Sequence, residues 1–194
     1  MKHSLTAADI LPLEEYEKIR KLKRAELRAI KKNRRVSIGP YATFYFENYD
    51  TMWLQIQEML RIEKGGEAQL IDELRAYNPM IPKGRELTAT LMFEIDDPLR
   101  RLEILSSIGG VEKTIEIRFE SETVKGVAER DLDYTSAEGK ASSVQFIHFP
   151  FTAAQVLKFI APGQEVMIAI THPHYGHMAI VPPNVRNELM KDFD

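Results

Sequence analysis

The segment that most constrains this chain is a predicted helix over residues 51–63, because apolar residues lie on most of its sides. They are Met52, Trp53, Leu54, Ile56, Met59, Leu60 and Ile62. Only Gln57 and Arg61 define a wet side of this helix. A helix that is apolar around most of its circumference is usually buried. We therefore expect other elements of the fold to cover it on more than one side.

Two polar residues stand among the apolar ones of this helix. Gln55 and Glu58 are three positions apart, so their side chains are neighbours on the helix surface. Burying a carboxylate is costly unless a cation, a metal or several donors compensate its charge. Glu58 therefore needs a partner. Either it pairs with an arginine or a backbone donor and fixes the packing, or Gln55 and Glu58 belong to a binding or metal site.

The composition predicts one domain, or one domain with a small appendage. With 194 residues, of which 44% are hydrophobic and 28% charged, the chain is long enough to bury a substantial core. We expect a single α+β domain over residues 1–194, with a helical portion over about 1–80, a sheet-rich portion over about 81–181 and a C-terminal helix over about 182–194.

Several functional classes are disfavoured by what the sequence lacks. Cysteine is absent, which excludes thiol nucleophiles, disulfides, thiolate zinc sites and cysteine-bound iron–sulfur clusters. No apolar run is long enough for a signal peptide or a membrane span, so we expect a cytoplasmic protein without membrane contact. There is no Walker loop and no GxGxxG, HExxH or GxSxG motif, which argues against the enzyme classes that use them.

The charge is distributed unevenly along the chain. Residues 18–35 contain ten basic residues and one acid, Glu26, although the whole chain carries a net charge of −3. Such a block can attract phosphates or an acidic partner. It can equally be the solvated face of an amphipathic helix that turns Tyr16, Ile19, Leu22 and Leu27 toward the core. Nucleic-acid binding is disfavoured, because no recognition motif or stacking aromatic residue accompanies the charge.

Hydrophobic periodicity predicts the other elements. We expect strands over 35–38, 42–46, 87–95, 114–119, 123–128, 143–149 and 165–171, and helices over 12–33, 67–77, 98–105, 152–160 and 183–192. The clearest hairpin joins the runs 114–119 and 123–128, in which Ile115, Ile117 and Phe119 alternate with charged residues. Helices and strands mix without regular βαβ alternation, so we expect an α+β fold with a mainly antiparallel sheet, several packed helices and a basic N-terminal helix.

A second candidate site is a histidine-rich loop that follows the last predicted strand. His172, His174 and His177 fall within six residues. Loops that leave a rigid sheet often carry function, and two histidines with a carboxylate are the usual ligands of non-haem iron. The alternatives are an exposed polar loop, or histidines whose hydrogen bonds are satisfied by neighbouring backbone groups. Nothing in the sequence places this loop beside Glu58.

Four groups of residues resemble one bacterial family. They are Phe46-Glu47-Asn48 with Asp50-Thr51, the run from Gln55 to Arg61, Tyr77-Asn78-Pro79 with Ile81-Pro82, and His172-Pro173 with Tyr175 and His177. The chain resembles the domain-of-unknown-function family 3501 (DUF3501) over essentially its whole length. Members of that family look to be encoded near rubrerythrin-like and heterodisulfide-reductase-type proteins, which implies a link to peroxide or electron-transfer metabolism. The family pattern leaves the position of His174 open and so favours His172 with His177.

These observations give one leading hypothesis and two alternatives. The leading hypothesis is an accessory protein of redox or peroxide-related metabolism that binds a small ligand or a divalent metal ion, iron or zinc. Its predicted metal ligands are Glu58, His172 and His177, and its predicted ligand-binding residues are Gln55, Glu58, Arg61, Tyr77, Asn78 and Tyr175. The first alternative is a scaffold or interaction protein, either a homodimer or the partner of an iron–sulfur redox enzyme. The second is a nucleic-acid binder that uses the basic helix. No catalytic residue is assigned.

Overall fold

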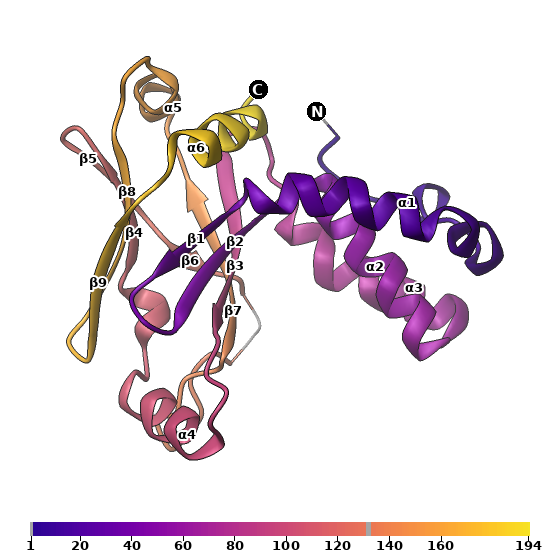
Figure 1. Ribbon diagram of the computed structural model, residues 1–194, viewed down its shortest axis with the longest axis horizontal. Coiled ribbons are helices and arrows are strands. Elements are labelled where there is room, and N and C mark those ends of the chain that lie inside the picture. Colours follow the sequence, from indigo (N-terminus) through magenta and orange to yellow (C-terminus); the bar gives the residue numbers. More distant parts are fainter. Residues whose placement is uncertain (1, 131–132) are drawn as a thin grey trace.

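The computed structural model describes residues 2–130 and 133–194. Two antiparallel sheets lie face to face, and three helices form an arm that extends away from them (Figure 1). The first sheet has the strand order β1-β2-β3-β7-β6 and the second has the order β5-β4-β8-β9. We call the two sheets together the sandwich. The predicted α+β fold with antiparallel pairing is confirmed.

The elements have the following bounds. The five-stranded sheet contains β1 (Arg35–Ile38), β2 (Ala42–Glu47), β3 (Glu86–Phe93), β7 (Val144–Pro150) and β6 (Val127–Ala128). The four-stranded sheet contains β5 (Glu122–Lys125), β4 (Ile115–Phe119), β8 (Val166–His172) and β9 (Tyr175–Ile180). The arm consists of α1 (Leu13–Lys32), α2 (Tyr49–Glu63) and α3 (Gly66–Tyr77). The remaining α-helices are α4 (Pro98–Ser107), α5 (Ala153–Ile160) and α6 (Pro183–Leu189), and short 3-10 turns include Met190–Asp192.

The main core lies between the two sheets. Successive strand residues point to opposite faces, so every second residue faces the opposing sheet. Phe44 and Ile147 reach this interior from the five-stranded sheet, and Ile117 and Ile168 reach it from the other. Each of the four is at most 1% exposed. Burial of these apolar side chains is the main term that stabilises the sandwich.

Gly126 divides a run that the sequence predicts as one strand. Residues 122–125 pair with β4 in one sheet, whereas residues 127–128 pair with β7 in the other. The Gly126 N–H donates to the carbonyl of Ile115 at 2.8 Å. A Cβ atom at this position would come within 2.9 Å of the Ile147 side chain. The chain therefore crosses between the sheets where only glycine fits, which alternation alone did not reveal.

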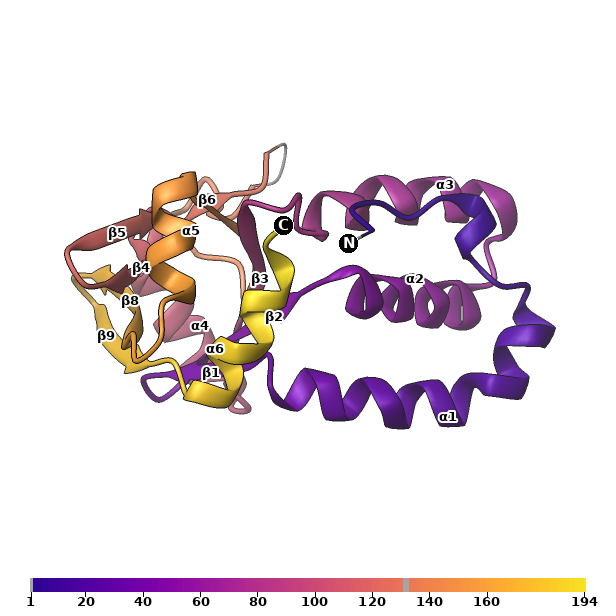
Figure 2. The same ribbon diagram turned by 90° about the horizontal axis from the view of Figure 1, so that it is seen from above.

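In the arm, α2 lies between α1 and α3 (Figure 2). The helix begins with reciprocal hydrogen bonds between Asn48 and Thr51, both at 2.9 Å, which satisfy two backbone N–H groups. It ends at Glu63, and Lys64 adopts a left-handed conformation with φ of 54°. Two apolar clusters, one toward α1 and one toward α3, cover the helix as its sequence predicts.

The predicted distribution of polar and apolar sides on α2 is partly wrong. Gln57, expected on the wet side, is 2% exposed, and Ile62, expected to be covered, is 65% exposed. The buried residues of α2 all lie between Thr51 and Gln57, whereas Ile62 lies in the last turn. A count of apolar residues around a helix does not show how far its neighbours extend along it.

A buried ion pair joins the arm to the sandwich. Arg34, just after α1, and Asp192, near the C-terminus, each have side chains that are 1% exposed. Arg34 donates from Nη1 to Asp192 Oδ1 at 3.1 Å, and its Nη2 also bonds the second carboxylate oxygen. It further donates from Nε to the carbonyl of Phe46 at 3.0 Å and from Nη2 to that of Glu47 at 2.8 Å. The buried charge is therefore matched by a carboxylate and two carbonyls.

We expect Asp192→Asn to lower the free energy of unfolding by about 3 kcal/mol, because it leaves a buried guanidinium without its counter-charge. Urea denaturation followed by circular dichroism measures this change. Lys191→Ala is the matched control: Lys191 pairs with Glu188 at 2.6 Å but its side chain is 66% exposed, so its loss should cost less than about 1 kcal/mol. Equal effects from the two substitutions would contradict the role given to Asp192.

Candidate ligand-binding cleft

A cleft of about 810 Å³ lies where the arm meets the outer face of the five-stranded sheet. The sheet supplies its floor. Tyr45, Thr90 and Phe146 are register partners on β2, β3 and β7, so their side chains lie side by side on one face. Met92 and Val144 form the next row. The floor is thus mainly aromatic and aliphatic.

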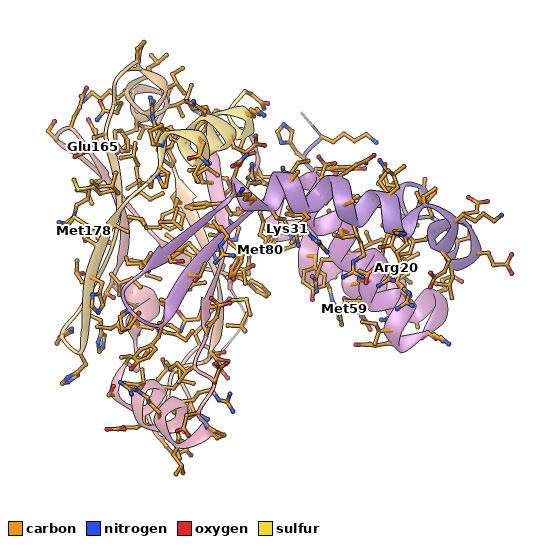
Figure 3. All side chains as sticks on the ribbon, in the orientation of Figure 1. Arg20, Lys31, Met59, Met80, Glu165 and Met178 are labelled. Carbon is orange, nitrogen blue, oxygen red and sulfur yellow. The ribbon has the colours of Figure 1, made fainter. Side chains whose placement is uncertain are left out.

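One wall of the cleft is basic. Arg28, Lys31 and Lys32 come from the last turns of α1 and Arg35 from the start of β1. Figure 3 shows Lys31 at the sheet end of α1, well along the helix from Arg20. Among the residues that the structure describes, no carboxylate oxygen lies within 4.0 Å of a side-chain nitrogen of these four cations, so none of them forms an ion pair. The Arg35 guanidinium lies over the Tyr45 ring, 5.7 Å from its centroid.

Two of the sequence-predicted ligand-binding residues, Gln55 and Tyr77, lie in this cleft. Gln55 Nε2 donates to the Tyr77 hydroxyl at 3.4 Å. Burial raises the pKa of Tyr77, and nearby carboxylates raise it further, so the phenol is neutral at physiological pH. Helix α2 and the end of α3 therefore contribute two uncharged polar side chains that face the sheet.

Glu58 lies outside the cleft, between α1 and α2. Its carboxylate accepts hydrogen bonds from Arg20 Nε at 2.8 Å and Nη2 at 2.9 Å, and from the Tyr16 hydroxyl at 2.5 Å. The bidentate bond to Arg20 lowers the pKa of Glu58 to about 2, against the opposite effect of partial burial. Pairing with an arginine to fix the packing is therefore what the structure shows.

The three predicted metal ligands do not share a site. His172 and His177 lie on the β8–β9 hairpin, on the side of the sandwich away from the arm that carries Glu58 (Figures 1 and 2). His172 Nδ1 accepts the His174 N–H at 3.2 Å and its Nε2 donates to the carbonyl of Gly109 at 3.3 Å, so both ring nitrogens are engaged. No group of three or more histidine or acidic side chains suited to a metal occurs within residues 2–130 and 133–194.

The predicted histidine loop is a tight hairpin. His172 and Tyr175 are register partners, which leaves a two-residue turn between them. His177 lies within β9, and its ring contacts that of Tyr175, with 4.6 Å between centroids. These side chains belong to strands, so strand alternation sets the direction in which they point. His172 and Tyr175 lie on the buried side.

Tyr175 fastens the two sheets together. Its hydroxyl donates to the carbonyl of Ile38 at 2.9 Å and accepts the N–H groups of Tyr41 and Ala42, each at 3.0 Å. These three bonds link the start of β9 to the β1–β2 turn. Tyr175 is buried at 3% exposure. These hydrogen bonds between the sheets account for the burial of Tyr175, which does not line the cleft.

Arg61 and Asn78 also contact other parts of the arm. Arg61 pairs with Glu17 of α1 at 2.5 Å. Asn78 accepts the N–H of Leu5 at 2.7 Å and donates to its carbonyl at 2.9 Å, which ties the N-terminal segment to the end of α3. Neither residue lines the cleft.

Sequence reasoning missed several residues of the cleft. Glu47 lies on its floor, is 7% exposed and accepts the Thr90 hydroxyl at 2.7 Å. The sequence shows the basic run over residues 18–35. Which of these side chains line the cleft depends on how α1 crosses the sheet. Tyr45 and Glu47 are two positions apart in β2 and so share one face of the sheet. This pattern alone could not identify the cleft, because the sequence does not show which face the arm covers.

Comparison with known proteins finds one family and one crystal structure, both described as of unknown function. The model of the family DUF3501, described as protein of unknown function, matches residues 4–193. A crystal structure at 1.90 Å resolution of a protein of unknown function from Burkholderia pseudomallei K96243 is 36% identical, with a TM-score of 0.90, and the match covers 98% of this chain and 100% of that one. No curated protein matches significantly. No described helix is long and apolar enough to cross a membrane.

The bridge of Glu58 to Arg20 should make stability depend on pH. Because the pKa of Glu58 is about 2 in the folded chain against 4.5 when unperturbed, its contribution is complete above about pH 4.5 and is lost as the pH falls toward about 2. We expect Glu58→Gln to cost about 2 kcal/mol at pH 7 and almost nothing at the acid end. Urea titrations across this range test the difference.

The matched control is Glu17→Gln, which removes the other ion pair between α1 and α2. Glu17 has a side chain that is 45% exposed, so its substitution should cost less than about 1 kcal/mol at every pH. A difference between Glu58→Gln and the native protein that does not change with pH would refute the assignment.

Proposed function

The chain belongs to DUF3501, a family of proteins of unknown function, and we propose from the geometry of the cleft that it binds a small organic anion with an apolar body. The observation that carries the proposal is a basic wall above an apolar floor, with no carboxylate paired to the wall among the described residues. The volume of about 810 Å³ lies within the roughly 300–1,000 Å³ that is usual for small-molecule sites.

The four cations of the wall, Arg28, Lys31, Lys32 and Arg35, have no acidic partner among the described residues. Some other cations of this region are paired, Arg20 with Glu58, Lys23 with Glu26 and Arg34 with Asp192. Lys18, Lys21 and Arg24 of α1 are exposed to solvent away from the cleft. The four of the wall instead border an apolar cavity, where the effective dielectric constant is lower than in water. An anion that enters the cleft would gain their attraction and bury its apolar part against Met52, Phe146 and their neighbours.

The proposal keeps the small-ligand part of the sequence hypothesis. Two predicted residues, Gln55 and Tyr77, belong to the cleft and offer hydrogen bonds that orient a ligand. We propose a binding role, since the cleft offers anchors and apolar surface. Three predictions from the sequence remain predictions. They are a role in redox or peroxide-related metabolism, association as a homodimer or with a redox protein, and a cytoplasmic location.

Two dyes that share an apolar skeleton test the proposal. Anilinonaphthalenesulfonate (ANS) is anionic, whereas N-phenyl-1-naphthylamine is neutral. We expect Arg28→Gln combined with Lys32→Gln to raise the Kd of ANS about tenfold, which corresponds to about 1.4 kcal/mol. The Kd of the neutral dye should change less than about twofold. Fluorescence titration measures both, with circular dichroism to show that the fold is kept.

The control removes two cations from the same helix, with Lys18→Gln and Lys21→Gln. Both residues are exposed and neither lines the cleft. The ANS affinity of this variant should stay close to that of the native protein, although added salt should weaken ANS binding to both through screening. Equal losses of ANS affinity in the two double variants, or equal losses of both dyes, would overturn the proposal.

A further inference from the structure

Glu47 is the residue of the cleft whose environment is least explained by the fold. It ends β2, is 7% exposed and lines the cleft. Its side chain accepts one hydrogen bond, from the Thr90 hydroxyl to Oε1 at 2.7 Å. In the part of the chain that the structure describes, no lysine, arginine or histidine nitrogen lies within 4.0 Å of its carboxylate.

One hydroxyl donor is little compensation for a buried carboxylate. Two carboxylate oxygens can accept about four hydrogen bonds, and buried charges are normally paired with cations or with several donors. The nearby guanidinium of Arg34 does not serve this purpose, because it binds Asp192 and the backbone carbonyl of Glu47 rather than its side chain. Glutamine would fill the same space without the charge.

The cleft offers further acceptors beside this carboxylate. Gln55 lines the cleft and uses its Nε2 to donate to Tyr77, and no hydrogen bond to its amide oxygen occurs among the described residues. Tyr77 lies close enough for the charge of Glu47 to contribute to raising its pKa. Glu47, Gln55 and Tyr77 thus gather oxygen atoms on the side of the cleft formed by β2, α2 and the end of α3.

We infer that Glu47 binds an ammonium group of the ligand, so that the cleft is built for zwitterions: an anionic group meets the wall of Arg28, Lys31, Lys32 and Arg35, apolar atoms cover the floor, and a protonated amine meets Glu47. The inference rests on the proposed function and narrows its ligand class to amino acids with a large apolar part. Both charges of such a ligand find partners that the chain itself leaves unmatched.

Competition against bound ANS tests the inference with three probes: dodecanoate, 2-aminododecanoate and 12-aminododecanoate. In the native protein we expect at least one amino acid to displace ANS at a concentration about tenfold below that of dodecanoate. Glu47→Gln should abolish this preference without weakening ANS binding, because it removes a negative charge from the cleft that holds the anionic dye. Glu103→Gln is the control, because Glu103 is an exposed residue of α4 that does not line the cleft, and it should keep the preference.

A stability measurement separates ligand recognition from a structural role. Glu47→Gln should unfold at the same or a higher urea concentration than the native protein, since it removes a poorly compensated charge. A lower midpoint, or an amine preference that is absent from the native protein or survives Glu47→Gln, would overturn the inference. If the Kd of ANS does not change when Arg28→Gln and Lys32→Gln are combined, the proposed anion site is refuted, whatever the result for Glu47.

Discussion

The contact between Arg34 and Asp192 determines how the two parts of this molecule are held. The arm and the sandwich each have apolar clusters, which meet where Phe146 of β7 packs against the cluster of α2 and α3. A guanidinium that also binds two backbone carbonyls fixes both the position and the direction in which α1 leaves the sheet. Because hydrogen bonds of this kind are directional, they set an angle that packing alone would leave adjustable.

The cleft is a consequence of that angle. Helix α1 is fixed at its C-terminal end and pairs with α2 farther along, through Tyr16 and Arg20 bound to Glu58. Between these two fixed points the helix borders a space over the outer face of β2, β3 and β7. Cations at its last turns therefore face apolar residues of the sheet. The residue that the sequence singled out, Glu58, holds the wall of the cleft in place without entering it.

Local patterns in the sequence predicted the elements, whereas the site depended on contacts between distant residues. Periodicity located the helices and most strands, and the sequence indicated that Glu58 needs a partner, with an arginine, a backbone donor and a binding or metal site left open. The choice between arginine and histidine could not be made, because Arg20 and His172 are both far from Glu58 in the sequence. Glu47 was named only within the family pattern and not as a site residue, because its burial depends on a cleft that distant elements form.

The separation of Arg34 and Asp192 along the chain, 158 residues, has a consequence for biosynthesis. During translation the arm can form early, since its helices contact one another within the first 80 residues. Its attachment to the sandwich must wait until α6 and the turn after it have emerged from the ribosome, because domains made N-terminal first complete their distant contacts last. A nascent chain would therefore carry a helical unit that forms its ion pair with Asp192 only after the strands of both sheets have been made.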